Sequence, residues 1–209
     1  MSFGHHYASL LVPLALGLAS CAGTPTDFKF DPARNTGLVV GSISYEGGLG
    51  RYVLVAKDKS TGAIVSFNFG CTLVPCFTST DDEKFSKGEV PKQRGGGFAV
   101  EVPAGEYQIV AWQIVQGAKR STSTSPIDIP LMVEKGKASY VGNLHFDAHW
   151  ENIQLRDKVQ RDLPLLQAQY PVLEKTPLAY SIAAGTSIEK LGGSYQSRIK
   201  FPVIIPIVR

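Results

Sequence analysis

Residues 98–112, FAVEVPAGEYQIVAW, determine the fold expected for this chain. Apolar and polar residues alternate on both sides of Pro103-Ala104-Gly105, and a period of two is typical of strands that are buried on one face. Proline and glycine favour a turn between the two runs, because glycine reaches backbone angles that other residues avoid. The segment therefore predicts a β-hairpin.

The same alternation occurs along much of the chain. In residues 63–69 the apolar residues at odd positions would share one face, with Ser66 and Asn68 on the other. Strands at this spacing imply a sandwich or a barrel. We expect a mainly β fold, an antiparallel β-sandwich of about eight strands with one short helix near the C-terminal end. The other predicted strands begin at Leu38, Arg51, Phe98, Glu106, Pro126, Ser139 and Asn152.

The expected helix covers residues 161–173, RDLPLLQAQYPVL. Asp162 is a candidate cap, Pro164 suits a first turn, and Pro171 would end the run. Leu163, Leu166 and Tyr170 would face the sheet. We therefore expect a domain over 38–174 and a C-terminal extension over 175–209. An edge strand is expected within 199–208, because its two prolines exclude it from a central position.

The composition is that of a folded protein without a nucleic-acid footprint. The 209 residues are 44% hydrophobic and 19% charged, which does not fit disorder throughout the chain. The net charge is only +3, and the basic residues are scattered. A phosphate backbone requires a concentrated basic surface, so nucleic acid is excluded as an expected partner.

The N-terminal region predicts a cleavable signal peptide over residues 1–20. Residues 7–20 carry no charge and are too few to cross a bilayer as a helix. The sequence Leu18-Ala19-Ser20-Cys21 that follows resembles the lipobox of bacterial lipoproteins, in which the cysteine is acylated and becomes the new N-terminus. The first six residues lack the Lys or Arg that is usual there. The alternative is a buried apolar helix.

Residues 21–37 are rich in small and polar residues and predict a flexible tether. The resemblance to Gram-negative lipoproteins implies transfer to the outer membrane, because Ala22 stands where an acidic residue would retain the protein in the inner one. The expected location is therefore the cell envelope. The lipid on Cys21 would hold the protein at the membrane, facing the periplasm or the surface.

The remaining cysteines, Cys71 and Cys76, form an even pair that can make a disulfide in an oxidising compartment. Because the loop between them is short, such a bond would shape a local turn more than stabilise the whole fold. Two free buried thiols are the alternative. A zinc site is less favoured, since no other cysteine lies nearby.

Two segments resemble a known class of β-sandwich. FAVEVPAGEYQIVAW, with its turn before Tyr107, is similar to the hairpin of transthyretin-like, or prealbumin-like, modules. VEKGKASYVGNLHF, residues 133–146, resembles the part that follows in uncharacterised bacterial lipoproteins with such a sandwich. The resemblance implies a fold and a compartment, and no catalytic residue.

One constellation suggests metal chemistry. His145, Asp147 and His149 would share one face if the strand beginning at Ser139 stayed extended. Two imidazoles and a carboxylate can bind zinc, although same-face residues on a strand lie roughly 6.5 to 7 Å apart and need a bend to converge. A solvated strand end is the alternative. This trio supports a second hypothesis, a metal-binding protein or metal-dependent enzyme.

Two polar segments are candidate contact regions. Residues 78–97 predict a long loop, either mobile or a docking element anchored by Phe85 and Val90. Residues 117–126 predict a solvated turn, and an anion site at Lys119 and Arg120 is the alternative. The common hydrolase, phosphate-binding and dinucleotide motifs are absent, and no cofactor is expected. The leading hypothesis is a non-enzymatic envelope module that binds another envelope protein, a glycan or a small ligand, or plays a structural role.

Overall fold

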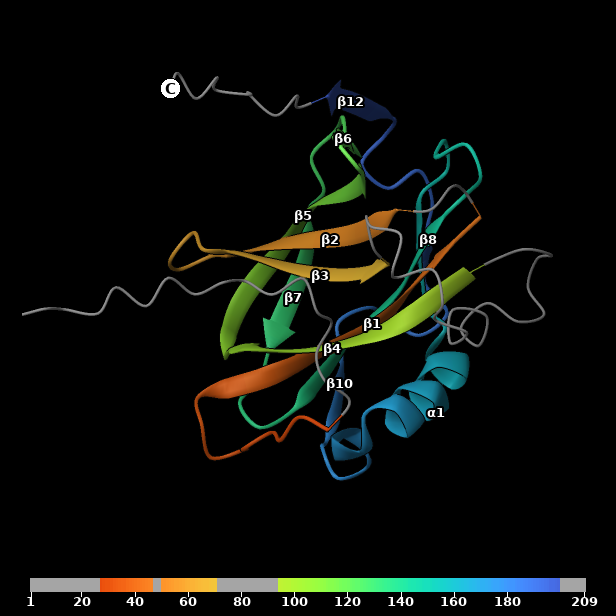
Figure 1. The fold of residues 1–209 in the computed structure, drawn as a ribbon. Helices are drawn as coiled ribbons and strands as arrows, with labels where there is room; N and C mark the ends of the chain where they lie inside the picture. Colours follow the sequence, from red (N-terminus) through yellow and green to blue (C-terminus); the bar gives the residue numbers. More distant parts are fainter. Residues whose placement is uncertain (1–26, 47–49, 71–93, 200–209) are drawn as a thin grey trace, which may run out of the picture.

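The computed structural model describes residues 27–46, 50–70 and 94–199, which form two β-sheets, each of six strands, and one α-helix. The strands of sheet A run in the order β11-β9-β8-β1-β4. The sixth strand, β10, pairs with β8 and lies outside this order. Figure 1 shows α1, Val159–Gln169, beside the strands of this sheet. The sheet A strands are β1 (Thr36–Tyr45), β4 (Arg94–Pro103), β8 (Ala138–Phe146), β9 (Gln154–Arg156), β10 (Leu178–Tyr180) and β11 (Ser187–Ile188).

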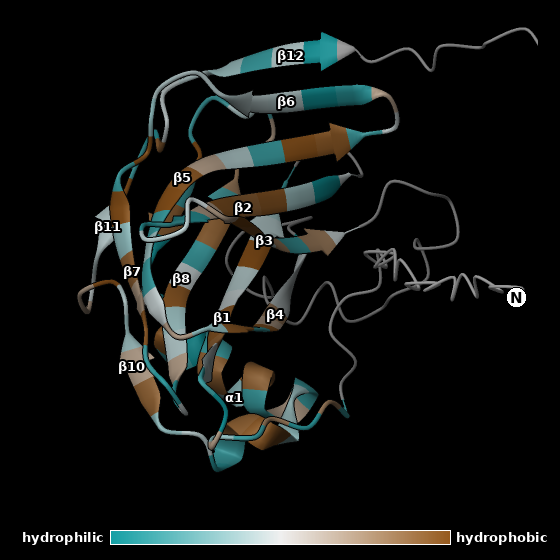
Figure 2. Cartoon of the chain, turned by 90° about the vertical axis from the view of Figure 1, so that its left-hand side faces the viewer, coloured by the Kyte–Doolittle hydropathy of each residue, from teal (hydrophilic) through white to brown (hydrophobic). Residues whose placement is uncertain are grey.

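Sheet B has the order β12-β6-β5-β2-β3, and β7 pairs with another part of β5. Figure 2, turned by 90° from Figure 1, shows the strands of sheet B one above another, and β6 and β12 are polar along most of their length. Its strands are β2 (Arg51–Asp58), β3 (Ile64–Gly70), β5 (Gly105–Gln116), β6 (Lys119–Ser123), β7 (Ile129–Val133) and β12 (Tyr195–Ile199).

The mainly β sandwich with one α-helix is confirmed, but the described residues contain twelve strands where the sequence indicated about eight. Residues 117–126, expected to be a solvated turn, contain β6. Two pairings also differ from the antiparallel pattern, because β8 runs parallel to both β1 and β10. The predicted hairpin at 98–112 is two consecutive strands in different sheets, with β4 paired to β1 and β5 paired to β2.

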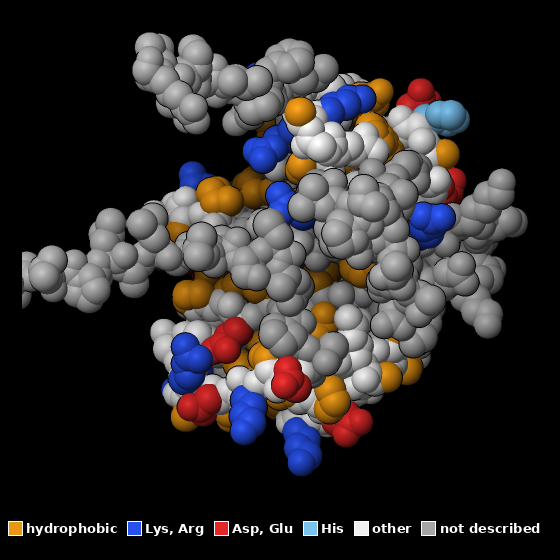
Figure 3. All heavy atoms as spheres, in the orientation of Figure 1, with side chains coloured by type: hydrophobic (Ala, Val, Ile, Leu, Met, Phe, Trp, Pro, Cys, Tyr) orange, Lys and Arg blue, Asp and Glu red, His pale blue; other side chains and the backbone are white. Residues whose placement is uncertain are grey.

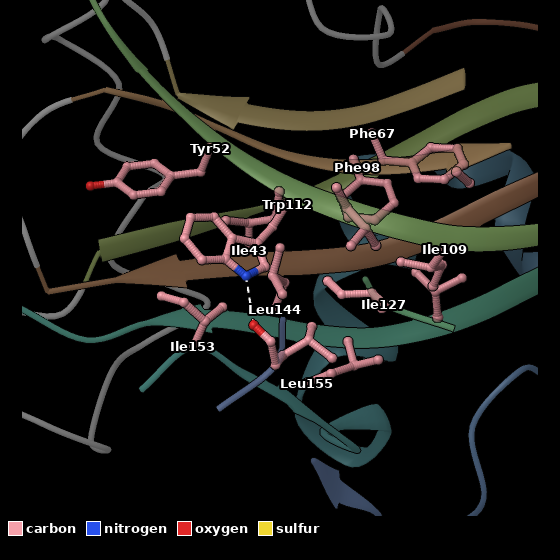
Figure 4. Packing of buried hydrophobic residues seen from close by; sticks show 14 of the residues in the cluster. Ile43, Tyr52, Phe67, Phe98, Ile109, Trp112, Ile127, Leu144, Ile153 and Leu155 are labelled. Carbon is pink, nitrogen blue, oxygen red and sulfur yellow. Dashed lines mark hydrogen bonds between the residues drawn. The ribbon is translucent and has the colours of Figure 1, made fainter. Parts of the chain in front are cut away.

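The main core lies between the two sheets. Trp112 of β5 is completely buried, and its indole Nε1 donates a hydrogen bond of 2.7 Å to the carbonyl oxygen of Leu191. Figure 4 shows side chains from both sheets pointing into this layer. Tilted and edge-on rings extend the core toward the end of β8, with Phe146 in contact with both Tyr52 and Trp112.

Glycines let β3 and β4 approach each other where the sheets meet. A Cβ on Gly96 would lie 1.8 Å from the ring of Phe69, which is impossible without movement. Residues 94–97 form the first part of β4, whereas the sequence predicted that they end a long loop over 78–97. The rest of that loop, 78–93 with Phe85 and Val90, lies outside the described residues.

The helix covers the apolar half of the outer face of sheet A. Leu166 and Tyr170 pack against Val40 and Tyr140 in a second cluster of buried residues. The helix begins at Val159, earlier than predicted, and ends before Pro171, which starts a 3-10 turn, η3 (Pro171–Glu174). No helix in the described ranges is long and apolar enough to span a bilayer.

Both ends of the domain differ from their predicted boundaries. Residues 27–35 fall within the expected tether, yet Phe28 and Phe30 pack against the helix cluster, and the ring of Phe28 meets that of Tyr170 edge-on at 6.2 Å. The apolar rings explain this, because they bury area that a polar tether would leave in water. At the other end, β10, β11 and β12 lie beyond residue 174 and pair into the two sheets, and residues 200–208 of the edge strand expected within 199–208 lie outside the described residues.

Candidate functional site

A row of polar side chains occupies the half of the outer face of sheet A beyond the helix cluster. Because side chains alternate along a strand, Ser42 and Ser44 of β1 share the outer face with Val40. Asn143 and His145 of β8 lie directly opposite these serines in the parallel register. All four polar residues are buried, so their hydrogen-bonding groups need partners within the protein.

The helix contributes a buried carboxylate to this row. Asp162 is completely buried, and its Oδ2 accepts hydrogen bonds from Ser42 Oγ at 2.6 Å and from Tyr140 Oη at 2.7 Å. Its Oδ1 lies 2.7 Å from the guanidinium of Arg161, whose side chain is 18% exposed. Asp162 therefore links the helix to β1 and β8 through charge-assisted bonds.

Burial dominates the electrostatics of this carboxylate. Desolvation raises the pKa of Asp162 above its ordinary value, against the lowering effects of Arg161, Ser42 and Tyr140. Burial and the neighbouring carboxylate also raise the pKa of Tyr140, which remains a neutral phenol that can donate to Asp162. The arrangement places the carboxyl group of Asp162 between a guanidinium and two hydroxyl donors.

A second chain of hydrogen bonds runs along the same face. His145 Nδ1 lies 2.9 Å from Ser44 Oγ, and His145 Nε2 lies 3.2 Å from Glu46 Oε1. Asn143 connects the two halves of the row, because its Nδ2 donates to Ser42 Oγ at 2.8 Å and its Oδ1 accepts from Arg156 at 2.8 Å. One continuous network therefore extends from Asp162 to Glu46.

Ser44, His145 and Glu46 are connected in the same sequence as the nucleophile, the base and the carboxylate of a hydrolase triad. Ser44 is completely buried, and its hydroxyl also lies 3.2 Å from Asn143 Oδ1. A substrate carbonyl cannot approach Ser44 Oγ in this arrangement, because nucleophilic attack needs close contact with the reacting carbon. The geometry supports cohesion between helix and sheet better than it supports acyl transfer.

The expected metal trio is not brought together. His145 points to the outer face of sheet A, whereas Asp147 and His149 follow the strand, which ends at Phe146. Asp147 Oδ1 instead accepts a hydrogen bond from the backbone of Asn152 in the turn. No three His, Cys, Asp or Glu side chains in the described ranges are placed to hold a metal ion. The condition for a shared face is not met, because the strand does not stay extended and the chain turns at Asp147.

The sequence pattern predicts only part of this network. Asp162 was expected to cap the helix, but the helix starts three residues earlier, and Asp157 Oδ1 instead accepts from the backbone of Val159. The spacing of Asp162, Leu166 and Tyr170 by four residues indicates that they share one helix face, so Asp162 lies on the side that packs against the sheet. Cys21, Cys71 and Cys76, the other predicted site residues, lie outside the described residues.

Comparisons with known proteins assign no family. No family model matches the chain, and no curated protein matches it. Among solved structures, a leucine-rich repeat protein from Bacteroides thetaiotaomicron is 20% identical, with a TM-score of 0.32. The match covers 56% of this chain and 14% of that protein. A similarity this weak supports no conclusion about the fold or the function of this chain.

Proposed function

We propose that the protein is a lipid-anchored module of the bacterial cell envelope that binds a partner or plays a structural role without catalysing a reaction. The observation that carries the proposal is Leu18-Ala19-Ser20-Cys21, which follows an uncharged apolar stretch. Small residues before the cysteine suit a peptidase that must reach the backbone, and a thiol can carry a thioether-linked lipid.

The described domain is consistent with such a role. Its strands begin at Thr36, so 14 residues separate Cys21 from the first strand. Its most conspicuous polar network is buried and holds α1 to sheet A, and both serines within it, Ser42 and Ser44, are completely buried. A lipid anchor confines such a module to a surface and raises its effective concentration toward partners on the same membrane.

The test is lipid labelling of the full chain expressed in a Gram-negative bacterium. With an alkyne-tagged palmitate, we expect the wild-type chain to be labelled and shortened at its N-terminus. Cys21→Ala should lose the label and accumulate as the precursor. Ser20→Ala is the matched control, since it keeps a small residue before the cysteine and should mature normally. Normal maturation of Cys21→Ala would refute the proposal.

The proposed destination within the envelope has its own test. Ala22 follows the cysteine, and we infer that the lipidated chain is transferred to the outer membrane. Ala22→Asp should shift the labelled protein to the inner-membrane fraction on a density gradient, while Ala22→Ser should not. An identical distribution of the wild type and Ala22→Asp would contradict this assignment without affecting lipidation itself.

The disulfide between Cys71 and Cys76 remains a proposal for the same compartment. Mass spectrometry of the peptide that contains both residues, taken from protein trapped with a thiol-blocking reagent, should show unblocked cysteines that react only after reduction. Cys71 and Cys76 blocked before any reduction would contradict the pairing.

A further inference from the structure

The outer face of sheet B carries a row of arginines that the proposed anchoring does not explain. In the strand register, Arg198 of β12 lies opposite Arg120 of β6, Arg120 opposite Val115 of β5, and Val115 opposite Arg51 of β2. Directly paired residues point to the same face of a sheet. Ile114, next to Val115, is buried in the core, so the arginine row faces away from the core.

The pair Arg120 and Arg198 is unfavourable as it stands. Like charges directly opposite each other on neighbouring strands destabilise a sheet. Both side chains are exposed, and the ion pairs among the described residues include neither of them. Figure 3 shows Lys and Arg side chains in the upper part of the molecule, where Figure 1 places β6 and β12. An anionic partner would remove the repulsion between the two guanidinium groups.

The same strand ends the sheet. β12 pairs with β6 on one side, and no other described strand pairs with β12. An exposed edge offers backbone N–H and C=O groups to an added strand. The side chains of β12 alternate beside that edge, so Arg198 and Gln196 face outward while Ser197 faces inward, where its hydroxyl lies 2.8 Å from that of Ser121.

Contacts with the ring of Trp150 hold the β12 edge in place. The ring of Trp150 meets that of Tyr195 edge-on at 5.7 Å, and Lys119 Nζ lies 5.5 Å from the centre of the Trp150 ring. Trp150 has a φ of 60°, a left-handed conformation that is unusual for a bulky residue. The contacts with Tyr195 and Lys119 fix β6 and β12 relative to the end of β8, so a partner strand would meet a preformed edge.

From these observations we propose that the edge of β12 is a docking site for an extended acidic polypeptide segment, which adds to sheet B as a further strand. In such a segment every second side chain would face outward, and one of its carboxylates would lie beside Arg198, in line with the arginine row. A guanidinium binds a carboxylate through two parallel hydrogen bonds, which is why arginine suits this role better than lysine. The proposal names a partner class for the module described above, and rests on that function only for the compartment.

The test uses the full chain in a non-ionic detergent and a synthetic peptide of alternating Glu and Thr. We expect fluorescence anisotropy to show binding that weakens at high salt. Arg198→Glu and Arg120→Glu should each weaken it by at least about tenfold, since a charge-assisted bond contributes roughly one such factor or more. Lys175→Glu makes the same charge change at an exposed site beside α1 and should bind like the wild type.

Three controls separate strand addition from other binding modes. A peptide methylated on its backbone nitrogens keeps its charge but cannot pair with an edge, so it should fail to bind. Dextran sulfate should bind more weakly than the unmethylated peptide. Arg198→Lys should lose part of the affinity. Absence of peptide binding, equal binding by the Glu variants, or equal binding of the methylated peptide would each overturn the proposal. None of these outcomes depends on whether Cys21 carries a lipid.

Discussion

The two faces of β1 are covered in different ways. On the inner face, Val39, Ile43 and Tyr45 pack into the apolar core between the sheets. On the outer face, the first half of the strand contacts apolar residues of α1, whereas Ser42 forms part of a hydrogen-bond network with the carboxylate of Asp162. Both faces are buried, but only the outer one is packed against a buried carboxyl group.

The difference separates two ways of stabilising a layer. Apolar packing between the sheets depends on area and shape and tolerates small shifts. A buried carboxylate accepts hydrogen bonds only in a narrow range of positions, so Asp162 fixes where the helix lies along the sheet. Leu166 and Tyr170 supply apolar area on the same helix face. The comparison leads to three predictions about stability.

The largest effect is expected in the inner layer. Trp112→Ala removes the largest completely buried side chain and should lower the free energy of unfolding by about 3–5 kcal/mol. Trp112→Phe keeps most of the packing but leaves the carbonyl of Leu191 without its donor, and should cost about 1 kcal/mol. Urea unfolding followed by circular dichroism measures both. Equal losses for the two variants would show that the hydrogen bond, and not the packed area, dominates.

A smaller loss is expected at the helix. Asp162→Ala leaves Arg161, Ser42 and Tyr140 without their acceptor and should cost about 3 kcal/mol. Glu174→Ala, at an exposed acidic residue after the helix, should change stability by less than about 0.5 kcal/mol. Relative to the wild type, Asp162→Ala should increase the rate of hydrogen exchange more in α1 than in β5. A uniform increase over both elements would contradict a local role for the carboxylate.

The smallest effects concern pH and have opposite signs for two carboxylates. Burial raises the folded-state pKa of Asp162, so its contribution to stability is full below the unfolded pKa and is lost as the pH rises through the folded pKa. Hydrogen bonds from Ser60 and Thr61 lower the pKa of Asp58 from 3.8 to about 2. The contribution of Asp58 is therefore present above about 3.8 and lost as the pH falls through about 2.

Unfolding curves at a series of pH values test this contrast. The stability of the wild type minus that of Asp162→Asn should decrease as the pH rises from about 4. The corresponding difference for Asp58→Asn should decrease as the pH falls from about 4 toward 2. Slopes of the same sign for the two variants would show that burial does not dominate the pKa of Asp162.

The strands of the core were predictable because their side chains alternate. The run from Ala63 to Phe69 and the two runs around Pro103 each match a strand in the structure. β6 was not predictable in this way, because Ser121, Thr122 and Ser123 give no apolar signal at the polar end of sheet B. Pairing outside the core depends on neighbouring strands that a local pattern does not contain.

The candidate site was harder to predict, because its members come from distant parts of the chain. Ser42 and Asp162 are 120 residues apart, and Ser44 and His145 are 101 apart. His145 was identified from the sequence, but with the wrong partners, since local spacing suggested Asp147 and His149. The turn after Phe146 removes that grouping, and the parallel pairing of β8 with β1 creates another. Only the register between strands shows which polar residues meet.

The position of β1 between β4 and β8 also determines when sheet A can form. Its two neighbours, β4 and β8, start about 60 and 100 residues later in the chain, so this strand gains no partner until much of the polypeptide has left the ribosome. A newly made N-terminal half therefore cannot close its sheet by itself. If the chain is exported as proposed, sheet A is still incomplete while a translocation channel threads the N-terminal half.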